Sequence, residues 1–150
     1  MLRAQNLVRI FDGTRREVRA LDGVSLEVGA GELLAVRGPS GCGKTTLLLT
    51  VGALLHPSEG NVTVEGEDPY ALDPESRARF RAEKIGFVFQ QFHLVPYLTV
   101  EENVLAASLA TGRPDAPDRA RALIAQFGLA DRAAHVPAEL STGERQRTAL

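Results

Sequence analysis

Apolar and polar residues follow two different patterns in the first part of the chain. Val24–Val28 (VSLEV) and Asn61–Glu67 (NVTVEGE) alternate with a period of two, which is typical of half-buried strands. Leu33–Val36 (LLAV) and Ile85–Phe89 (IGFVF) are instead short and almost continuously apolar, as strands buried in a parallel sheet are. We therefore expect all four segments to be strands.

Two helices are predicted among these strands. Thr45–Leu55 has helical length and composition, and Pro57 cannot continue a helix. Asp73 precedes Pro74, and a side-chain cap followed by a proline with a preset φ angle is a typical helix start. The second of these helices should run to Lys84.

From about residue 92 onward the pattern becomes mainly helical. Thr99 with Glu102, and Ser141 with Glu144, form the T-x-x-E and S-x-x-E patterns of a capping box. Between them we expect a helix capped by Asp115. Its apolar positions follow i, i+3, i+4 and i+7 spacing, at Ala120, Leu123, Ile124 and Phe127, before Gly128.

Composition narrows the class of protein. The 150 residues, with 44% hydrophobic and 24% charged residues, are typical of a globular domain. A formal charge of −2 gives no support for nucleic-acid binding. The single cysteine excludes an internal disulfide. The longest apolar stretch, Leu47–Leu55, is too short for a membrane helix, and the N-terminus does not have the pattern of a signal peptide.

The strongest chemical pattern is GPSGCGKT, which matches G-x-x-x-x-G-K-[ST] and stands between an expected strand and an expected helix. Glycines allow backbone N–H groups to surround phosphates, while the lysine reaches the β- and γ-phosphates and the threonine hydroxyl binds Mg²⁺. A plain glycine turn would leave the lysine without a role. The expected nucleotide-binding residues are Gly38, Ser40, Gly41, Cys42, Gly43, Lys44, Thr45 and Thr46. Cys42 is either a tolerated small residue or a thiol whose modification would block nucleotide entry.

Two further motifs are ambiguous when each is taken alone. Gln90 and Gln91 follow the expected strand Ile85–Phe89, at the end where open α/β sheets bind ligands, but they could be ordinary surface amides. Leu140–Arg147 (LSTGERQR) could be only a capped, charged helix start.

Taken together and in this order, the phosphate loop, FVFQQ and LSTGERQR resemble the ATP-binding cassette ATPases of ABC transporters. The stretch IGFVFQQFHLVPYLTVEENV is most similar to the group that serves lipoprotein release and macrolide export. The resemblance covers nearly the whole chain. It implies an α/β fold in which an N-terminal antiparallel β layer and a P-loop NTPase (RecA-like) core together occupy about residues 1–91. A helical subdomain with the signature would follow over about residues 92–150.

The resemblance also implies roles for residues outside the phosphate loop. Phe11 would stack on adenine, and Gln90 would bind Mg²⁺ and act with Lys44 in catalysis. Phe92–Tyr97, with His93 as a contact residue, would face an integral membrane permease. Ser141, Thr142, Gly143 and Glu144 would contact the ATP held by a second copy of the chain. This implies a head-to-tail homodimer that is peripheral on the cytoplasmic face of the cell membrane.

Two departures from the family pattern affect this interpretation. The usual LSGGQ is replaced by LSTGE, so Thr142 adds a side chain near a phosphate and Glu144 places a carboxylate where an amide is usual. We expect a working variant, in which the Glu144 carboxylate points either to the ribose or away from the ATP. The family's water-activating acid pair and switch histidine are not found within 150 residues. We therefore expect the C-terminal part of the core to be missing, and this chain alone to bind ATP without hydrolysing it.

Other functions remain open at this point. A non-transport ABC ATPase would share the motifs, but ATPases of DNA repair carry long insertions between the glutamine and the signature. A kinase or GTPase of another P-loop class would leave LSTGERQR unexplained. A nucleotide-binding module without catalysis is the third alternative. The transported substrate is not encoded in a recognisable motif.

Overall fold

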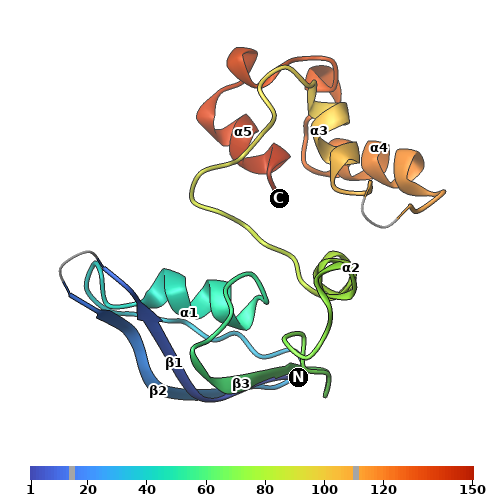
Figure 1. Ribbon diagram of the computed structural model, residues 1–150. Helices are drawn as coiled ribbons and strands as arrows, with labels where there is room; N and C mark the ends of the chain where they lie inside the picture. Colours follow the sequence, from blue (N-terminus) through green and yellow to red (C-terminus); the bar gives the residue numbers. More distant parts are fainter. Residues whose placement is uncertain (14–15, 110–111) are drawn as a thin grey trace. The chain divides into compact units, whose positions relative to one another are not determined.

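A computed structural model describes residues 1–13, 16–109 and 112–150. The chain forms two compact units, Met1–Ile85 and Gly86–Leu150, which are shown with their elements in Figure 1. The expected division at residues 91 and 92 concerned subdomains of a family fold, and it stays a prediction. We describe each unit by itself.

The first unit contains a three-stranded antiparallel sheet in the order β2-β1-β3. Its strands are β1 (Leu2–Phe11), β2 (Val18–Val28) and β3 (Glu59–Val64). In register, Leu2 of β1 lies opposite Val28 of β2 and Val64 of β3. The alternating segment Val24–Val28 thus lies in β2, whereas of Asn61–Glu67 only the part up to Val64 lies in β3, and a turn follows at Glu65 and Gly66. The resemblance correctly implied an N-terminal antiparallel layer.

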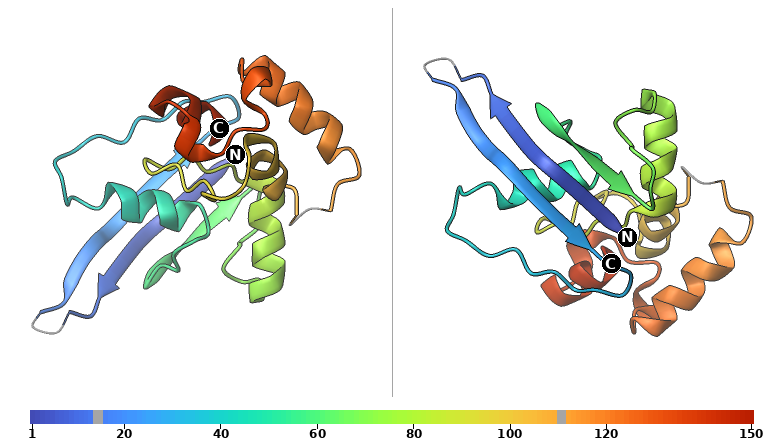
Figure 2. Two further views of the ribbon diagram at one scale, coloured as in Figure 1. Left: turned by 90° about the horizontal axis from the view of Figure 1, so that it is seen from above. Right: turned by 90° about the horizontal axis from the view of Figure 1, so that it is seen from below.

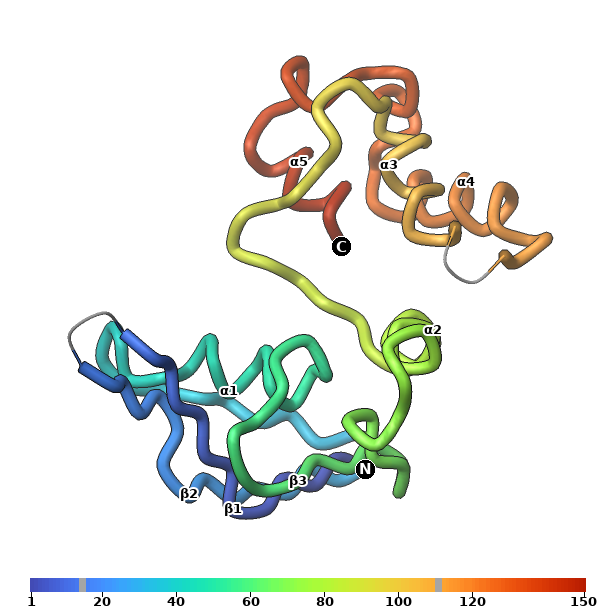
Figure 3. The backbone as a smooth tube through the Cα atoms, in the orientation of Figure 1, coloured from blue at the N-terminus to red at the C-terminus, as the bar shows by residue number. Residues whose placement is uncertain are grey.

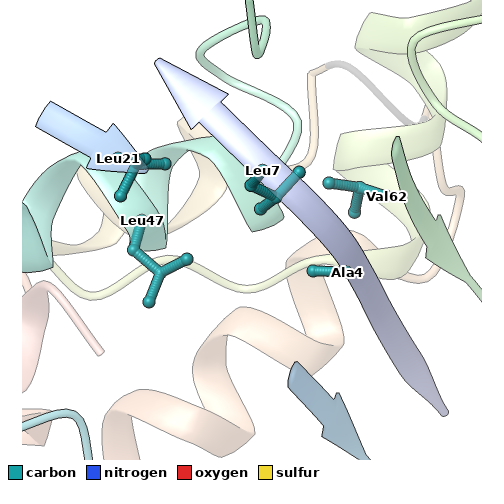
Figure 4. Packing of buried hydrophobic residues seen from close by; sticks show 5 residues of the cluster. All are labelled: Ala4, Leu7, Leu21, Leu47 and Val62. Atoms are coloured by element: carbon teal, nitrogen blue, oxygen red, sulfur yellow. The ribbon is translucent and has the colours of Figure 1, made fainter. Parts of the chain in front are cut away.

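Helix α1 (Lys44–Val51) covers one face of this sheet (Figure 1). Leu47 of α1 belongs to one buried cluster with side chains of all three strands, and Figure 4 shows its members Ala4, Leu7, Leu21, Leu47 and Val62. Each of these side chains is less than a tenth exposed. This small core therefore fixes the beginning of α1, and with it the phosphate loop, against the sheet.

Helix α2 (Pro74–Lys84) lies beside β3 at the edge of the sheet (Figure 2). The Asp73 carboxylate accepts hydrogen bonds from the backbone N–H groups of Glu75 (3.0 Å) and Ser76 (3.1 Å). The predicted cap and helix are both confirmed. Lys84 at the last turn forms an ion pair with Glu65, with 2.6 Å between Nζ and Oε2.

The second unit is helical, with α3 (Val100–Ala106), α4 (Ala116–Gln126), the 3-10 turns η1 (Ala130–Arg132) and η2 (Pro137–Glu139), and α5 (Thr142–Thr148). Its core consists of Val100, Ile124, Leu129 and Leu140. Both predicted capping boxes are present. Asp115 does precede α4, but its side chain makes no capping bond and instead pairs with Arg113.

The two continuously apolar segments are not strands, so that prediction was wrong for this structure. Leu33–Val36 and Ile85–Phe89 are not part of any strand, and Figure 3 draws their path along the chain. The sheet of the described residues consists only of β1, β2 and β3, and a strand needs a neighbour for its backbone N–H and C=O groups. Leu33 is 96% exposed and Val88 61% exposed, although Val36 packs against the first core.

Helix α1 is also shorter than predicted. It ends at Val51 with Gly52 as its cap, and Ala53 adopts a left-handed φ of 59°. The chain therefore leaves the helix before Pro57, although that residue had been expected to end it.

Candidate functional site

The phosphate loop has the backbone geometry that its glycines predicted. Gly41 and Gly43 have φ angles of 79° and 91°, a region that other residues rarely adopt. A Cβ atom at Gly43 would also collide with the carbonyl oxygen of Ala20 in β2. Gly43 is the cap residue from which α1 begins, so the loop turns directly into the helix N-terminus.

The Lys44 side chain folds back over this loop. Its Nζ donates hydrogen bonds to the carbonyl oxygens of Gly38 (2.9 Å) and Pro39 (2.6 Å), and lies 3.7 Å from Cys42 Sγ. Its ammonium charge is therefore held at the loop itself. Ser40, Cys42 and Thr45 are exposed, and Thr46 is half-buried at the first turn of α1.

The donor groups of this loop fit a polyphosphate. In the part of the chain that the structure describes, the backbone N–H groups of Gly41, Gly43, Lys44 and Thr45 have no hydrogen-bond acceptor. Unpaired N–H groups at a helix start, next to one ammonium group, form a suitable environment for phosphate oxygens. The exposed Thr45 hydroxyl is a suitable oxygen ligand for Mg²⁺.

Phe11 stands at the end of β1 and is 38% exposed. The Arg9 guanidinium carbon lies 4.7 Å from the centre of the Phe11 ring, within range of a cation–π contact. Arg9 Nη1 also donates to the carbonyl oxygen of His56 (3.1 Å). Sequence reasoning missed Arg9, although residues two apart on a strand share a face, so a cation at this spacing from the aromatic residue was a usable clue.

Gln90 lies in the second unit, at an exposed bend of the chain. Just before it, the rings of Phe87 and Phe89 stack with their centres 5.4 Å apart, and His93 meets Phe89 edge-on at 5.1 Å. His93 itself has a left-handed φ of 51°. Gln90 thus directly follows the Phe87–Phe89 ring pair and lies in sequence between Phe89 and His93, whose rings are in contact.

The segment that follows is attached to α3 by Asn103, which sequence reasoning also missed. The Asn103 side chain accepts a hydrogen bond from Val95 N–H (2.7 Å) and donates to the carbonyl oxygens of Val95 (3.2 Å) and Leu98 (2.9 Å). One amide side chain thus shapes the backbone after Phe92. An Asn within a helix gives no indication of such contacts until the fold is known.

The signature residues form the start of α5. Ser141 Oγ accepts a hydrogen bond from Glu144 N–H (3.3 Å), and Glu144 Oε2 accepts one from Ser141 N–H (2.7 Å). Thr142 and Gly143 are exposed. The Thr142 hydroxyl accepts a hydrogen bond from Arg145 (3.3 Å).

The Glu144 carboxylate turns back toward its own chain, while its relation to a phosphate stays a prediction. Glu144 Oε1 accepts a hydrogen bond from Arg132 Nε (3.1 Å), and the Glu144 side chain is only 20% exposed. Hydrogen bonds from the backbone and side chain of Ser141, and then one from Arg132, lower the pKa of Glu144 to about 2. The carboxylate is therefore ionised and paired at neutral pH.

No three His, Cys, Asp or Glu side chains among the described residues form a metal-binding cluster. Nor does any described helix have both the length and the apolarity required to cross a membrane.

Comparisons with known proteins agree with these motifs. Residues 21–150 match the sequence profile of the ABC transporter family. The whole chain is 47% identical to lipoprotein-releasing system ATP-binding protein LolD 1 of Rhodopirellula baltica, and covers 66% of it. It is 43% identical to the macrolide export ATP-binding/permease protein MacB of Burkholderia cenocepacia, of which it covers 22%.

The structure also matches a solved ATP-binding cassette. Over 99% of this chain and 67% of the other, it superimposes with a TM-score of 0.91 and 35% identity on MJ0796, described as dimeric and bound to ADP and Pi. The chain thus spans about two thirds of the length of LolD 1 and of MJ0796, and much less of MacB. From the family profile, the whole-chain identity and this fold, we conclude that the chain belongs to the ABC transporter family.

Proposed function

We propose that this chain is the nucleotide-binding part of an ATPase subunit that drives a membrane permease. The observation that carries the proposal is the phosphate loop, in which Lys44 and unpaired backbone N–H groups share one short segment at the start of α1. ATP is the ligand favoured by membership of the ABC transporter family. Gly38–Thr46 would hold its phosphates, and Phe11 would stack on its adenine.

The bound Mg²⁺ would take the hydroxyl of Thr45 and the amide oxygen of Gln90 as ligands. Such oxygen donors suit this ion, which also keeps waters and phosphate oxygens in its shell. Lys44 would neutralise charge on the β- and γ-phosphates. These roles stay predictions, supported by the exposure of both ligand side chains.

A second copy of the chain would complete the site. Ser141, Thr142, Gly143 and Glu144 of that copy would face the γ-phosphate, and two copies would enclose two ATP molecules head to tail. The dimeric state given for MJ0796 supports this arrangement. The permease would be contacted by Phe92–Tyr97, so the subunit would be peripheral on the cytoplasmic face of the membrane.

The names of the relatives suggest the kind of transport. LolD 1 is named for lipoprotein release and MacB for macrolide export. We therefore propose extraction or export of an amphipathic or lipid-linked substrate, rather than import. The substrate itself would be selected by the permease.

The experiment is ATP binding by the full-length protein, measured by calorimetry. Replacing Lys44 by Ala should weaken ATP binding at least tenfold, because an ion pair with phosphate is typically worth about 1.5–3 kcal/mol. The matched control is Lys84→Ala, which removes an exposed lysine that pairs with Glu65 outside the loop. Equal affinities of the two variants would contradict the proposal.

A further inference from the structure

Arg132 lies outside the signature stretch in sequence but reaches it in the structure. It is the last residue of η1, a turn that begins directly after Leu129, and Leu129 is 1% exposed in the core of the second unit. From there Arg132 Nε donates to Glu144 Oε1 at 3.1 Å. The guanidinium is thus anchored on a turn whose neighbour is part of the core.

Glu144 uses both of its oxygens within the chain. Oε1 takes the bond from Arg132, and Oε2 takes the bond from Ser141 N–H at 2.7 Å. A glutamine at this position has one acceptor oxygen and an NH₂ group, so it could not accept from both donors in the same way. The carboxylate therefore matches its surroundings better than the amide of the usual motif.

This arrangement also determines what the Ser141 hydroxyl can do. Its oxygen accepts from Glu144 N–H at 3.3 Å, so that lone pair is in use. The Ser141 side chain also forms a hydrogen bond with the Glu144 carboxylate, which contributes to the lowered pKa of Glu144. The carboxylate therefore helps to set where the Ser141 hydroxyl lies, and since that hydroxyl has a single proton, a phosphate oxygen would compete with the carboxylate for it.

We propose that Arg132 is a positioning residue for the contact between this chain and a nucleoside triphosphate held by a second copy. Arg132 orients Glu144, and Glu144 in turn holds the Ser141 hydroxyl in the position from which it would contact the γ-phosphate. The inference rests on the proposed function, since it needs the head-to-tail dimer. It adds a residue outside the signature to the site and explains how the LSTGE variant can work.

For the ion pair between Arg132 and Glu144, an effect on the orientation of Glu144 can be distinguished from an effect on the free energy of unfolding. The Arg132 side chain is 45% exposed, and ion pairs at such exposure usually contribute little to the free energy of unfolding. Removing the guanidinium should therefore leave the melting temperature nearly unchanged. It should instead leave Glu144 and Ser141 less well oriented, which affects only their contact with a phosphate.

The test uses the full-length protein with the slowly hydrolysed analogue AMP-PNP. Sedimentation velocity measures the nucleotide concentration that gives half-maximal dimer, and calorimetry measures binding to the monomer. Arg132→Ala should raise the AMP-PNP concentration that gives half-maximal dimer at least fivefold. It should leave the affinity of the monomer for AMP-PNP and the melting temperature unchanged. Arg132→Lys should recover part of the effect, because it keeps the charge but not the planar fork.

The matched control is Arg113→Ala, which breaks another exposed ion pair of the same unit, with Asp115 at 3.2 Å. It should leave dimerisation unchanged. In a Glu144→Gln background, Arg132→Ala should have no additional effect, since its partner is already altered.

Three results would overturn the inference. Arg132→Ala could behave like Arg113→Ala, its effect could persist undiminished beside Glu144→Gln, or its melting temperature could fall in step with dimerisation. If the unaltered protein fails to dimerise with AMP-PNP, the proposed function fails as well. That outcome is recognisable without any variant, so the two failures are distinguishable.

Discussion

Single residues show how the backbone restricts the choice of side chain in this protein. At Gly43 a left-handed φ and the nearby carbonyl of Ala20 both exclude a Cβ atom. At Gly143 the situation differs, because an added Cβ would meet only the end of the Arg147 side chain at an ordinary 3.7 Å. A substitution at Gly143 therefore tests contact with a partner rather than folding.

The proposed stacking of Phe11 on the adenine of ATP leads to a prediction about ATP binding. Phe11→Ala should weaken ATP binding about tenfold, because stacking of a base on an aromatic ring is typically worth about 1–3 kcal/mol. Phe11→Tyr should bind ATP normally, since it keeps the ring. Inorganic tripolyphosphate has no base, so it should compete with ATP at the phosphate loop with the same affinity in the original protein, Phe11→Ala and Phe11→Tyr. A loss of tripolyphosphate binding in Phe11→Ala would show that the ring supports the loop instead.

At the scale of elements, short helices depend on contacts at their ends. The end of α1 is held by Tyr70, whose hydroxyl lies 2.6 Å from the carbonyl oxygens of both Thr50 and Leu55. Burial raises the pKa of Tyr70 to about 12, so the hydroxyl keeps its proton. The start of α5 depends in the same way on the Ser141 and Glu144 capping bonds.

Replacing Tyr70 by Phe should lower the free energy of unfolding by about 1 kcal/mol, the typical contribution of a hydrogen bond. Chemical denaturation monitored by circular dichroism would measure it. Tyr97→Phe is the matched control, because Tyr97 is 79% exposed and no hydrogen bond of its hydroxyl is found among the described residues. The control should unfold like the original protein, and equal losses in both variants would contradict the role of Tyr70.

The capping of α5 should depend on pH. Because the pKa of Glu144 is lowered from 4.5 to about 2, its ionised form stabilises the folded state above pH 4.5, and this contribution disappears as the pH falls toward 2. The difference in melting temperature between the protein and Glu144→Gln should thus be constant from pH 8 to pH 6 and shrink below about pH 4.5. Carboxyl-carbon NMR of Glu144 would follow the titration directly. A midpoint near 4.5 would argue against the ion pair.

At the scale of the whole molecule, a site shared by two copies allows complementation. In the full-length protein, Lys44→Ala disables the phosphate loop, and Gly143→Asp places a carboxylate against the partner's phosphates. Each variant alone should lack ATPase activity. Mixed head-to-tail dimers contain one site with both halves intact, so mixing should restore part of the activity, up to about one quarter of the original for random pairing of equal amounts and independent sites.

Gly143→Ala is the control for that experiment, since it adds the Cβ without the charge and should stay active. Activity that remains absent in the mixture, with both variants folded and able to form dimers, would contradict a shared site. Full activity of Gly143→Asp alone would contradict the role of the signature.

Local patterns were sufficient for much of this molecule. The glycine loop, the Asp73 cap and the two capping boxes depend on residues within a few positions of one another, so their geometry could be predicted from the chain alone. The order of the three motifs then indicated the family that the profile match shows. Physical interactions over so short a range require no knowledge of the remaining fold.

Contacts between distant residues could not be predicted in this way. Leu33–Val36 and Ile85–Phe89 have the composition of buried strands, yet pairing depends on a neighbouring strand, and the described sheet provides none for them. Arg132 reaches Glu144 only because η1 and α5 pack in one unit. The sequence suffices for the loop that can hold a phosphate chain, whereas the packing of separate elements gives the signature carboxylate its partner, because such contacts depend on where the fold places each side chain.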